Sequence, residues 1–308
     1  MRVGRVGELW RYPVKSMQGD RLSTAEITTR WGVPGDRGWG LRDETVGEIR
    51  GAKRITSLLQ FHARYLEEPA GDSTPPVEIT FPDGSVRRSD DDDIHAALSK
   101  TVGRDVTLWP RMPRDDHAHY RRVRTSKSEM LAQHDLGPNE EFPDFSALPE
   151  DVLAELSRFA TPPGTYFDAM PLSLLTTASL ATVRRAAPDS AIDSRRFRKN
   201  IILETDAGIE TASGGCPELD WVGRRLQIGE VECDVVMPIA RCIMVGLPQA
   251  ELPHDRAILR ALATSTGMEL GVYLRVVTPG TICEGDVVDL HEAGSAAERA
   301  PIAAPGAH

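Results

Sequence analysis

The sequence predicts a β-rich α+β protein, and three observations lead to this class. Through residues 1–110, short segments alternate apolar and polar residues between turn residues, which is the pattern of half-buried strands. From residue 151 onward, segments with helical periodicity alternate with further strand patterns. The chain has 308 residues, of which 40% are hydrophobic and 27% charged, so it can form two ordinary globular domains with sizeable cores.

In the first part of the chain, the predicted strands are followed by one helix. Strand patterns cover residues 5–14, 21–31, 37–44, 62–68 and 77–88. Within the last of these, Gly84 suits a tight hairpin turn because glycine adopts a positive φ without strain. Ser89 can cap a helix, and the acids 90–93 would lie at the positive end of its dipole. The acidic run therefore indicates a helix start rather than a cation site.

The second part of the chain mixes helices and strands. Helical periodicity covers residues 151–159, 177–187 and 254–266, and strand patterns cover 200–206, 224–236 and 281–290. Pro188 closes the second helix and Gly267 the third. The composition of 111–150, rich in Arg, His, Asp and Pro, is typical of a connecting stretch. The Ala-, Pro- and Gly-rich tail from residue 293 is expected to be disordered.

Charge and hydropathy exclude several protein classes. A net charge of −10 argues against a general nucleic-acid binder, because affinity for the phosphate backbone comes from Lys and Arg. The longest apolar runs, such as 235–240, are far shorter than the roughly 20 residues of a membrane-spanning helix. The first 15 residues lack the continuous apolar stretch of a secretory signal. We therefore expect a cytoplasmic protein that binds neither nucleic acid nor membranes.

Cysteine and histidine spacing predicts no metal cluster. The four cysteines, Cys216, Cys233, Cys242 and Cys283, show neither the spacing of a zinc or iron–sulfur cradle nor that of a disulfide framework. His117 and His119 have no further ligand group nearby at a familiar spacing. Arg241 precedes Cys242, and a neighbouring cation favours the thiolate, which binds soft metals or attacks electrophiles. A structural cysteine is the alternative for Cys242.

Two turns after predicted strands could bind an anion. Lys15 and Ser16 follow the first strand, where the chain leaves the sheet and exposes backbone amides beside a cation and a hydroxyl. The turn GVPGDRG delivers Asp36 and Arg37 into the next strand, and a guanidinium held there can clamp a phosphate. A solvated lysine and a surface ion pair are the respective alternatives.

A third candidate is the basic stretch SRRFRKNI at 194–201. As a strand, it would place Arg196, Arg198 and Asn200 on one face. A guanidinium and a carboxamide on one face suit a ligand with an anionic end and an amide-like end. An exposed basic edge strand is the alternative.

These segments also occur in a recognisable order. The order runs YPVKSM, VPGDRGW, DAMPLSLLTTASL, RFRKNI and ELDWVGRRLQIGEVECDVVMPIARC. It resembles the MOSC superfamily, specifically proteins with an N-terminal MOSC β-barrel domain before the MOSC domain, a type that includes the mitochondrial amidoxime-reducing component and its bacterial relatives. The resemblance covers about residues 1–290. It implies a β-barrel-like domain over 1–112, a connecting segment over 113–165, a MOSC β-barrel domain with peripheral helices over 166–292, and a disordered tail over 293–308.

The resemblance implies a molybdenum cofactor, a pyranopterin dithiolene, with Cys242 as the protein ligand to molybdenum and hence the catalytic residue. The implied cofactor-binding residues are Lys15, Ser16, Arg37, Arg198, Asn200 and Arg241. Lys199 stands where the motif usually has proline. Pyridoxal phosphate binding is implied only at the level of the superfamily.

Two segments depart from the motifs. Residues 168–171, DAMP, lack the hydroxyl residues that relatives carry there, so a cofactor contact at this point would come from backbone groups. Residues 243–249, IMVGLPQ, lack the threonines and the acidic residue that follow the cysteine in relatives. Because the second segment is expected to border the substrate, the substrate class is the property least safely carried over.

The resemblance implies a molybdenum-dependent oxidoreductase that removes oxygen from N-hydroxylated or N-oxide-type small molecules. Because no four-cysteine cluster follows Cys283, a separate electron-donor protein with a flavin or an iron–sulfur cluster is expected. One alternative is a molybdenum cofactor carrier or sulfur-transfer protein, in which Cys242 would hold cofactor or persulfide. Another is a two-domain binding protein without a redox role.

Overall fold

The computed structural model describes residues 1–123, 126–132, 154–155, 157–209 and 211–292. The tail expected over 293–308 lies outside these residues, as do residues 151–153 and 156 of the helix expected over 151–159.

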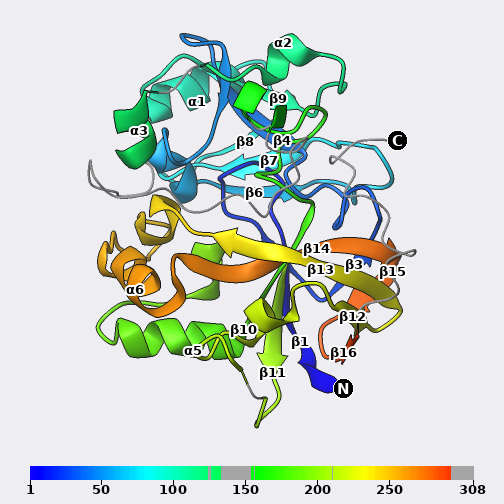
Figure 1. The fold of residues 1–308 in the computed structure, drawn as a ribbon. Helices are drawn as coiled ribbons and strands as arrows, with labels where there is room; N and C mark the ends of the chain where they lie inside the picture. Colours follow the sequence, from blue (N-terminus) through cyan, green and yellow to red (C-terminus); the bar gives the residue numbers. More distant parts are fainter. Residues whose placement is uncertain (124–125, 133–153, 156, 210, 293–308) are drawn as a thin grey trace.

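The largest element of the fold is a closed barrel of seven strands (Figure 1). Around the barrel the strands run β11 (Ile201–Thr205), β10 (Leu172–Thr176), β14 (Glu269–Thr278), β13 (Val231–Ala240), β12 (Arg225–Ile228), β16 (Val287–His291) and β1 (Arg2–Arg11). The pairing of β1 with β11 closes it, and β2 (Asp20–Leu22) extends outward from β1. Only the β10–β11 pair is parallel among the barrel pairs. The first strand of the chain therefore completes a barrel whose other strands all come from residues 172–291.

The barrel core is apolar and tightly closed. Fully buried members include Val6, Leu174, Leu203, Val235 and Val272. All five residues of β10 are buried, so this strand has no alternation for a sequence pattern to detect. Strand β14 is interrupted by shifts in its pairing with β13, which break its alternation. Both strands were missing from the sequence prediction for these reasons.

Smaller sheets form a second core in the upper half of Figure 1. One sheet contains β4 (Trp39–Asp43), β5 (Glu48–Arg50) and β9 (Val106–Pro110); another contains β6 (His62–Tyr65), β7 (Val77–Thr80) and β8 (Val86–Arg88). A separate pair, β3 (Thr24–Ile27) with β15 (Gly280–Cys283), instead packs Ala25, Ile27 and Ile282 into the barrel core, and so ties the first part of the chain to the last. Gly84 has a φ of 83° in the β7–β8 hairpin, as predicted.

Helices lie at the periphery. They are α1 (Ile94–Val102), α2 (His117–Tyr120), α3 (Lys127–Ala132), α5 (Thr177–Ala186) and α6 (Ala257–Thr266). Helices α5 and α6 pack beside the barrel (Figure 1) and share a core that includes Leu180, Ile258 and Leu262. The predicted β-rich α+β class with peripheral helices is confirmed. The expected domain bounds remain a prediction.

Two details of the predicted helices can be checked. Helix α6 ends at Gly267 in the left-handed conformation, as predicted. Ser89 does not cap α1, because its Oγ accepts a hydrogen bond from the backbone N–H of Val77 and the helix begins only at Ile94. The acids before α1 instead pair with the β8 arginines, as in the Arg88–Asp90 ion pair. The acidic run thus forms a turn ahead of the helix.

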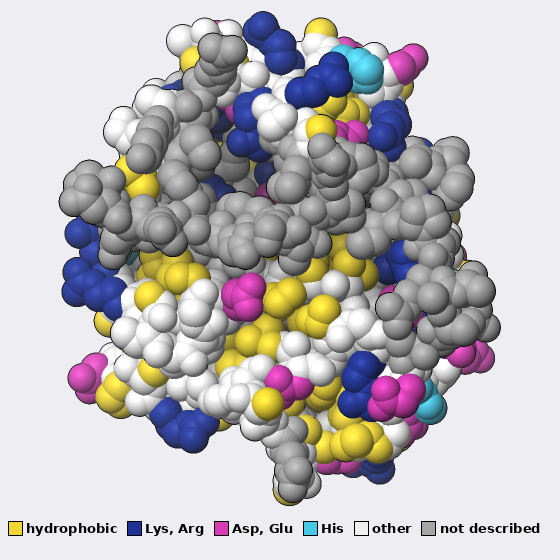
Figure 2. Space-filling view, viewed as in Figure 1, with side chains coloured by type: hydrophobic (Ala, Val, Ile, Leu, Met, Phe, Trp, Pro, Cys, Tyr) yellow, Lys and Arg dark blue, Asp and Glu magenta, His cyan; other side chains and the backbone are white. Residues whose placement is uncertain are grey.

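No described helix is long and apolar enough to cross a membrane. On the face shown in Figure 2, positive and negative side chains are dispersed among one another, and hydrophobic side chains gather over the barrel in the lower half.

Candidate cofactor-binding site

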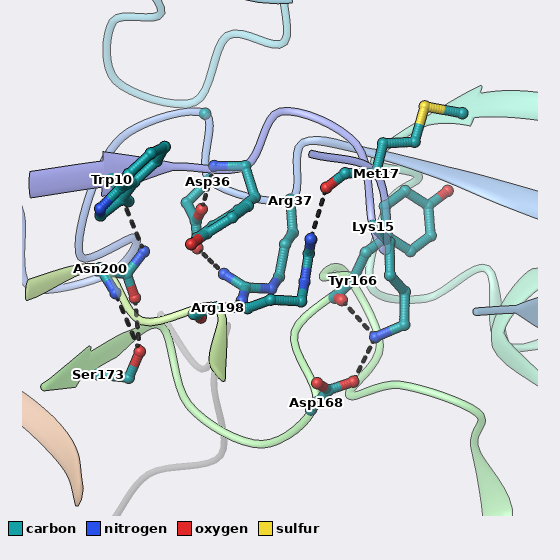
Figure 3. Close-up of polar contacts among 12 residues, drawn as sticks. Trp10, Lys15, Met17, Asp36, Arg37, Tyr166, Asp168, Ser173, Arg198 and Asn200 are labelled. Carbon is teal, nitrogen blue, oxygen red and sulfur yellow. Dashed lines mark hydrogen bonds and ion pairs between the residues drawn. The ribbon is translucent and has the colours of Figure 1, made fainter. Parts of the chain in front are cut away.

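Lys15 and Ser16 lie in the turn after β1. Lys15 Nζ donates to the carbonyl oxygen of Tyr166 at 2.9 Å and to Asp168 Oδ1 at 2.6 Å (Figure 3). Burial lowers the pKa of Lys15, and the neighbouring carboxylate of Asp168 opposes this shift. Ser16 Oγ accepts a hydrogen bond from the backbone N–H of Ala52 at 2.9 Å. Both residues are buried.

Asp36 fixes Arg37 against the same turn. The buried Asp36 carboxylate accepts from the backbone N–H of Tyr12 at 2.8 Å and forms an ion pair with Arg37. Arg37 Nη2 donates to the carbonyl oxygen of Arg198 at 3.3 Å. The carbon of each guanidinium lies over the Tyr12 ring, at 5.2 Å from its centroid for Arg37 and 4.3 Å for Arg198. A shared aromatic surface therefore holds two cations close together.

The predicted strand through Arg196, Arg198 and Asn200 is wrong. Residues Ser194–Phe197 form a 3₁₀ turn, because the Asp193 carboxylate accepts the backbone N–H of Arg195 and pairs with its guanidinium. Arg198 then adopts a φ of 54°, and β11 begins only at Ile201. Arg196 is consequently turned away from Arg198, with its guanidinium bonded to backbone carbonyls of other segments.

Arg198 and Asn200 differ in how many of their polar side-chain atoms have hydrogen-bond partners in the protein. Arg198 Nη1 donates to the carbonyl oxygen of Met17 at 2.7 Å, whereas its Nη2 is buried without a hydrogen-bond partner among the described residues. Burial and the charge of Arg37 lower the pKa of Arg198 to about 10. Asn200 Oδ1 accepts from Ser173 Oγ at 2.9 Å, and its Nδ2 donates to the Trp10 carbonyl at 3.3 Å (Figure 3). Asn200 thus links β1 to β10, and a ligand contact for it remains a prediction.

Arg241 and Cys242 follow β13. Cys242 is partly exposed and begins the 3₁₀ turn Ile243–Gly246. Arg241 is buried, and its Nη2 donates to the carbonyl oxygen of Phe197 at 3.1 Å. Its Nε is buried without a partner in the described part of the chain. Burial lowers the pKa of Arg241, and the charge of Cys242 opposes this shift, which places the two side chains in one electrostatic environment.

Four further residues join this group, and the sequence had not proposed them as ligands. They are Lys53, Asp168, Lys199 and Tyr273. Although the surrounding protein opposes its ionisation, the charges of Lys15 and Arg37 hold the pKa of Asp168 well below its usual value. Burial raises the pKa of Tyr273, and its neighbours include Asp168, Arg37, Arg241 and Cys242. Tyr273 thus connects the Lys15–Arg37 side of the group to the Cys242 side.

No local signal in the sequence marks Tyr273, which lies in the unpredicted strand β14. Lys199 carried one signal, the cation at a position where the motif usually has proline.

Backbone strain is concentrated at this site. Five non-glycine residues among those described have a positive φ, and three of them are Ser16 at 70°, Arg37 at 50° and Arg198 at 54°. Left-handed backbone costs roughly 1–2 kcal/mol for an L-residue, and strain of this kind clusters at ligand-binding sites. All three are among the residues that the sequence assigned to cofactor binding.

The group carries more positive than negative charge. Its cations are Lys15, Arg37, Lys53, Arg198, Lys199 and Arg241, and its carboxylates, within the described ranges, are Asp36 and Asp168. Buried cations without counter-charges are costly, so the arrangement suits an anionic ligand. The phosphate of a pyranopterin fits the cations, and the thiolate of Cys242 suits a soft metal.

The remaining cysteines lie elsewhere. Cys216 and Cys233 are buried in apolar cores, and Cys283 is exposed with its Sγ 3.4 Å from Thr24 Oγ1. Within the described ranges, no three His, Cys, Asp or Glu residues are grouped so that protein side chains alone could hold a metal ion.

Comparison with known proteins matches two segments of the chain to family models. Residues 162–289 match the MOSC domain, and residues 3–105 match the MOSC N-terminal beta barrel domain. The mitochondrial amidoxime-reducing component 1 of Mus musculus is 24% identical over 317 aligned residues, which cover 94% of this chain and 83% of that protein.

Two solved structures show weaker similarity. The YuaD protein from Bacillus subtilis is 11% identical with a TM-score of 0.43, and the match covers 95% of this chain and 97% of that one. The YiiM protein from Geobacillus stearothermophilus is 21% identical with a TM-score of 0.29, covering 42% of this chain and 57% of that one.

The two domain matches divide between them the segments that build the site. Lys15, Ser16 and Arg37 come from the first match, and Arg198, Arg241 and Cys242 come from the second. The chain is a member of the MOSC superfamily in which an N-terminal MOSC β-barrel domain precedes the MOSC domain.

Proposed function

We propose that this protein binds the molybdenum cofactor and reduces N-hydroxylated or N-oxide-type small molecules by removing an oxygen atom. The observation that carries the proposal is that two of the buried guanidinium nitrogens without a partner among the described residues, Arg198 Nη2 and Arg241 Nε, lie together in this one group. They belong to a group in which cations outnumber carboxylates. A MOSC domain is associated with this cofactor, and the relative from Mus musculus is named for reducing amidoximes, which are N-hydroxylated compounds.

Each residue has a distinct task in this proposal. Lys15, Arg37 and Arg198 would bind the cofactor phosphate, and the Ser16 hydroxyl can donate to it while its oxygen stays bonded to Ala52. Cys242 would supply the thiolate ligand to molybdenum, beside the charge of Arg241. When bound, the cofactor would supply the two-electron chemistry for this oxygen removal, which consumes two protons and yields water. A separate electron-donor protein would provide the electrons.

The first experiment measures molybdenum and pterin per chain after expression in a host that makes the cofactor. Wild type is compared with Cys242→Ala and, as a matched control, Cys283→Ala, which removes an exposed thiol elsewhere. We expect near-stoichiometric molybdenum in wild type and in the control, and loss of the metal or an altered visible spectrum in Cys242→Ala. Full activity with bound molybdenum in Cys242→Ala would overturn the ligand assignment.

A turnover assay distinguishes an enzyme from a molybdenum cofactor carrier. Cofactor-loaded protein is given benzamidoxime and a reduced viologen dye, and benzamidine formation is followed. Turnover with retained cofactor supports the enzyme. Transfer of cofactor to a cofactor-free molybdoenzyme, without turnover of any N-oxygenated substrate, would instead support a carrier.

A further inference from the structure

Lys199 is a buried cation between two residues of the proposed cofactor site. It follows Arg198 and precedes Asn200, and only 5% of its surface is exposed. Its stem runs beside Gly271 of β14, where a Cβ would lie 3.6 Å from Lys199 Cδ. Lys199 Nζ lies 5.6 Å from the centroid of the Tyr273 ring. The side chain is therefore held along β14, toward the strand's aromatic residue.

Lys199 has no counter-charge bonded to it. No hydrogen bond or ion pair joins its Nζ to another residue in the part of the chain that the structure describes. Burial and the charges of Arg241 and Arg37 lower its pKa well below the usual value, and Asp168 opposes them only in part. A buried ammonium beside other cations is unfavourable unless an anion joins it. The fold thus keeps a position for an anionic group at Lys199.

This position adjoins Arg241, the residue before Cys242, and also lies near the charges of Arg37, Asp168 and Arg198. Arg241 is the charged group that most affects Lys199, and Cys242 is the one that most affects Arg241. Tyr273, under the Lys199 ammonium, also has Cys242 among its electrostatic neighbours. Lys15, in contrast, is bonded to Asp168 and Tyr166. Lys199, unlike Lys15, is therefore left without a bonded partner for its charge among the described residues.

We propose that Lys199, held over Tyr273 and beside Arg241, forms an oxyanion subsite that selects substrates bearing a carboxylate or a similar anionic group. The inference rests on the proposed function and names the substrate class of that site. The motif's usual proline offers no charge at this position, so the subsite is a property of this chain's own sequence. The phosphate of the cofactor is also an oxyanion, and the test distinguishes it from a substrate carboxylate as the group that Lys199 binds.

The test compares a charged and a neutral probe of the same shape on cofactor-loaded protein. Benzoate and benzamide are titrated by calorimetry into wild type, Lys199→Met and Lys199→Arg, after molybdenum per chain has been measured. Lys100→Met is the matched control, because it removes one lysine from the exposed end of α1. We expect wild type and the control to bind benzoate about tenfold more tightly than benzamide. Lys199→Met should lose this preference and keep its molybdenum, and Lys199→Arg should retain most of the preference.

Three results would overturn the subsite. Equal affinities for the two probes in wild type, or an unchanged preference in Lys199→Met, would show that Lys199 binds no substrate anion. Loss of molybdenum from Lys199→Met would assign the lysine to the cofactor phosphate instead. If the proposed function itself fails, the wild-type protein contains no molybdenum. In that case the same titrations decide whether a Lys199-dependent anion site exists without the cofactor.

Discussion

Arg196 donates a hydrogen bond to the carbonyl oxygen of Val245, at 3.2 Å, three residues beyond Cys242. The same guanidinium donates to the carbonyl oxygens of Leu247 at 3.2 Å and Pro253 at 2.9 Å. Arg196 is 1% exposed and lies two residues before Arg198. One buried cation therefore ties the segment after the proposed metal ligand to the turn that carries a proposed cofactor-binding arginine.

Replacing Arg196 should destabilise the protein and disturb the Cys242 segment. Arg196→Met leaves several buried carbonyl groups without donors, so we expect the free energy of unfolding in urea to fall by about 3 kcal/mol or more. The lysine of Arg196→Lys can donate to only some of these carbonyl groups, so its free energy of unfolding should lie between those of wild type and Arg196→Met. The matched control is Arg195→Met, whose guanidinium pairs with Asp193 and Glu251 near the surface and should cost about 1 kcal/mol or less.

A positioning role for Arg196 has its own readout. If the guanidinium sets the Cys242 segment, the visible spectrum of cofactor-loaded Arg196→Lys should shift at unchanged molybdenum content. Equal losses of stability in Arg195→Met and Arg196→Met, with an unchanged spectrum in Arg196→Lys, would contradict this role.

The Tyr12 ring should matter more than its hydroxyl. Both Arg37 and Arg198 lie over the ring, and each cation–π contact contributes about 0.5–2 kcal/mol. Tyr12→Leu should therefore lower the free energy of unfolding by about 2 kcal/mol and reduce molybdenum content, whereas Tyr12→Phe should stay close to wild type in both measurements. A Phe variant as impaired as the Leu variant would show that the hydroxyl, not the ring, supports the arginines.

The left-handed backbone of Arg198 should serve binding rather than stability. Ala250 has the same backbone conformation, with a φ of 47°, so Ala250→Gly should raise the free energy of unfolding by up to about 1 kcal/mol. Arg198→Gly relieves the same strain and removes a buried charge, and these gains offset its lost contacts with the Tyr12 ring and the Met17 carbonyl, so we expect the cofactor-free protein to stay within about 1 kcal/mol of wild type in urea. Its molybdenum content, however, should fall about tenfold. Wild-type molybdenum content in Arg198→Gly would remove Arg198 from the cofactor site.

Several of the predicted strands, such as β7 and β12, have one buried and one exposed face, and this produces the alternating sequence pattern. Strand β10 is buried along its whole length and gave no such signal. Strand β14 is broken by pairing shifts opposite β13. The closing contact between β1 and β11 joins Gly4 to Thr205, and no local pattern can show a pairing across two hundred residues.

The residues of the candidate site likewise divide into those with a local signal in the sequence and those without one. Ser16 and Arg37 lie in turns whose residue types are visible locally, and their roles as ligands stay a prediction. Tyr273 enters only because the sheet order places β14 next to β10, close to the segment before β11, where Lys199 lies over its ring. The direction of the Arg196 side chain could not be predicted from the sequence either. The Asp193 cap makes residues 194–197 a turn rather than a strand, so Arg196 and Arg198 do not share a face.

Glu218 should make stability depend on pH. It is fully buried, and its Oε2 accepts hydrogen bonds from Thr176 Oγ1 and Ser179 Oγ, each at 2.6 Å. Burial raises the pKa of Glu218, against the effect of these two donors. The folded state therefore holds the proton more tightly than the unfolded state. Its contribution to stability is fully present below the ordinary glutamate range and is lost as the pH rises through the raised value.

Glu218→Gln removes this titration while keeping the size of the side chain and its ability to hydrogen-bond. Urea unfolding from pH 4.5 to 8 should show Glu218→Gln gaining on wild type as the pH rises, by at most about 1.4 kcal/mol per pH unit. The gain should level off above the raised pKa. Glu204→Gln, on the exposed side of β11, should follow wild type throughout. Parallel pH curves for wild type and Glu218→Gln would show that the hydroxyl donors compensate the burial of the carboxylate in full.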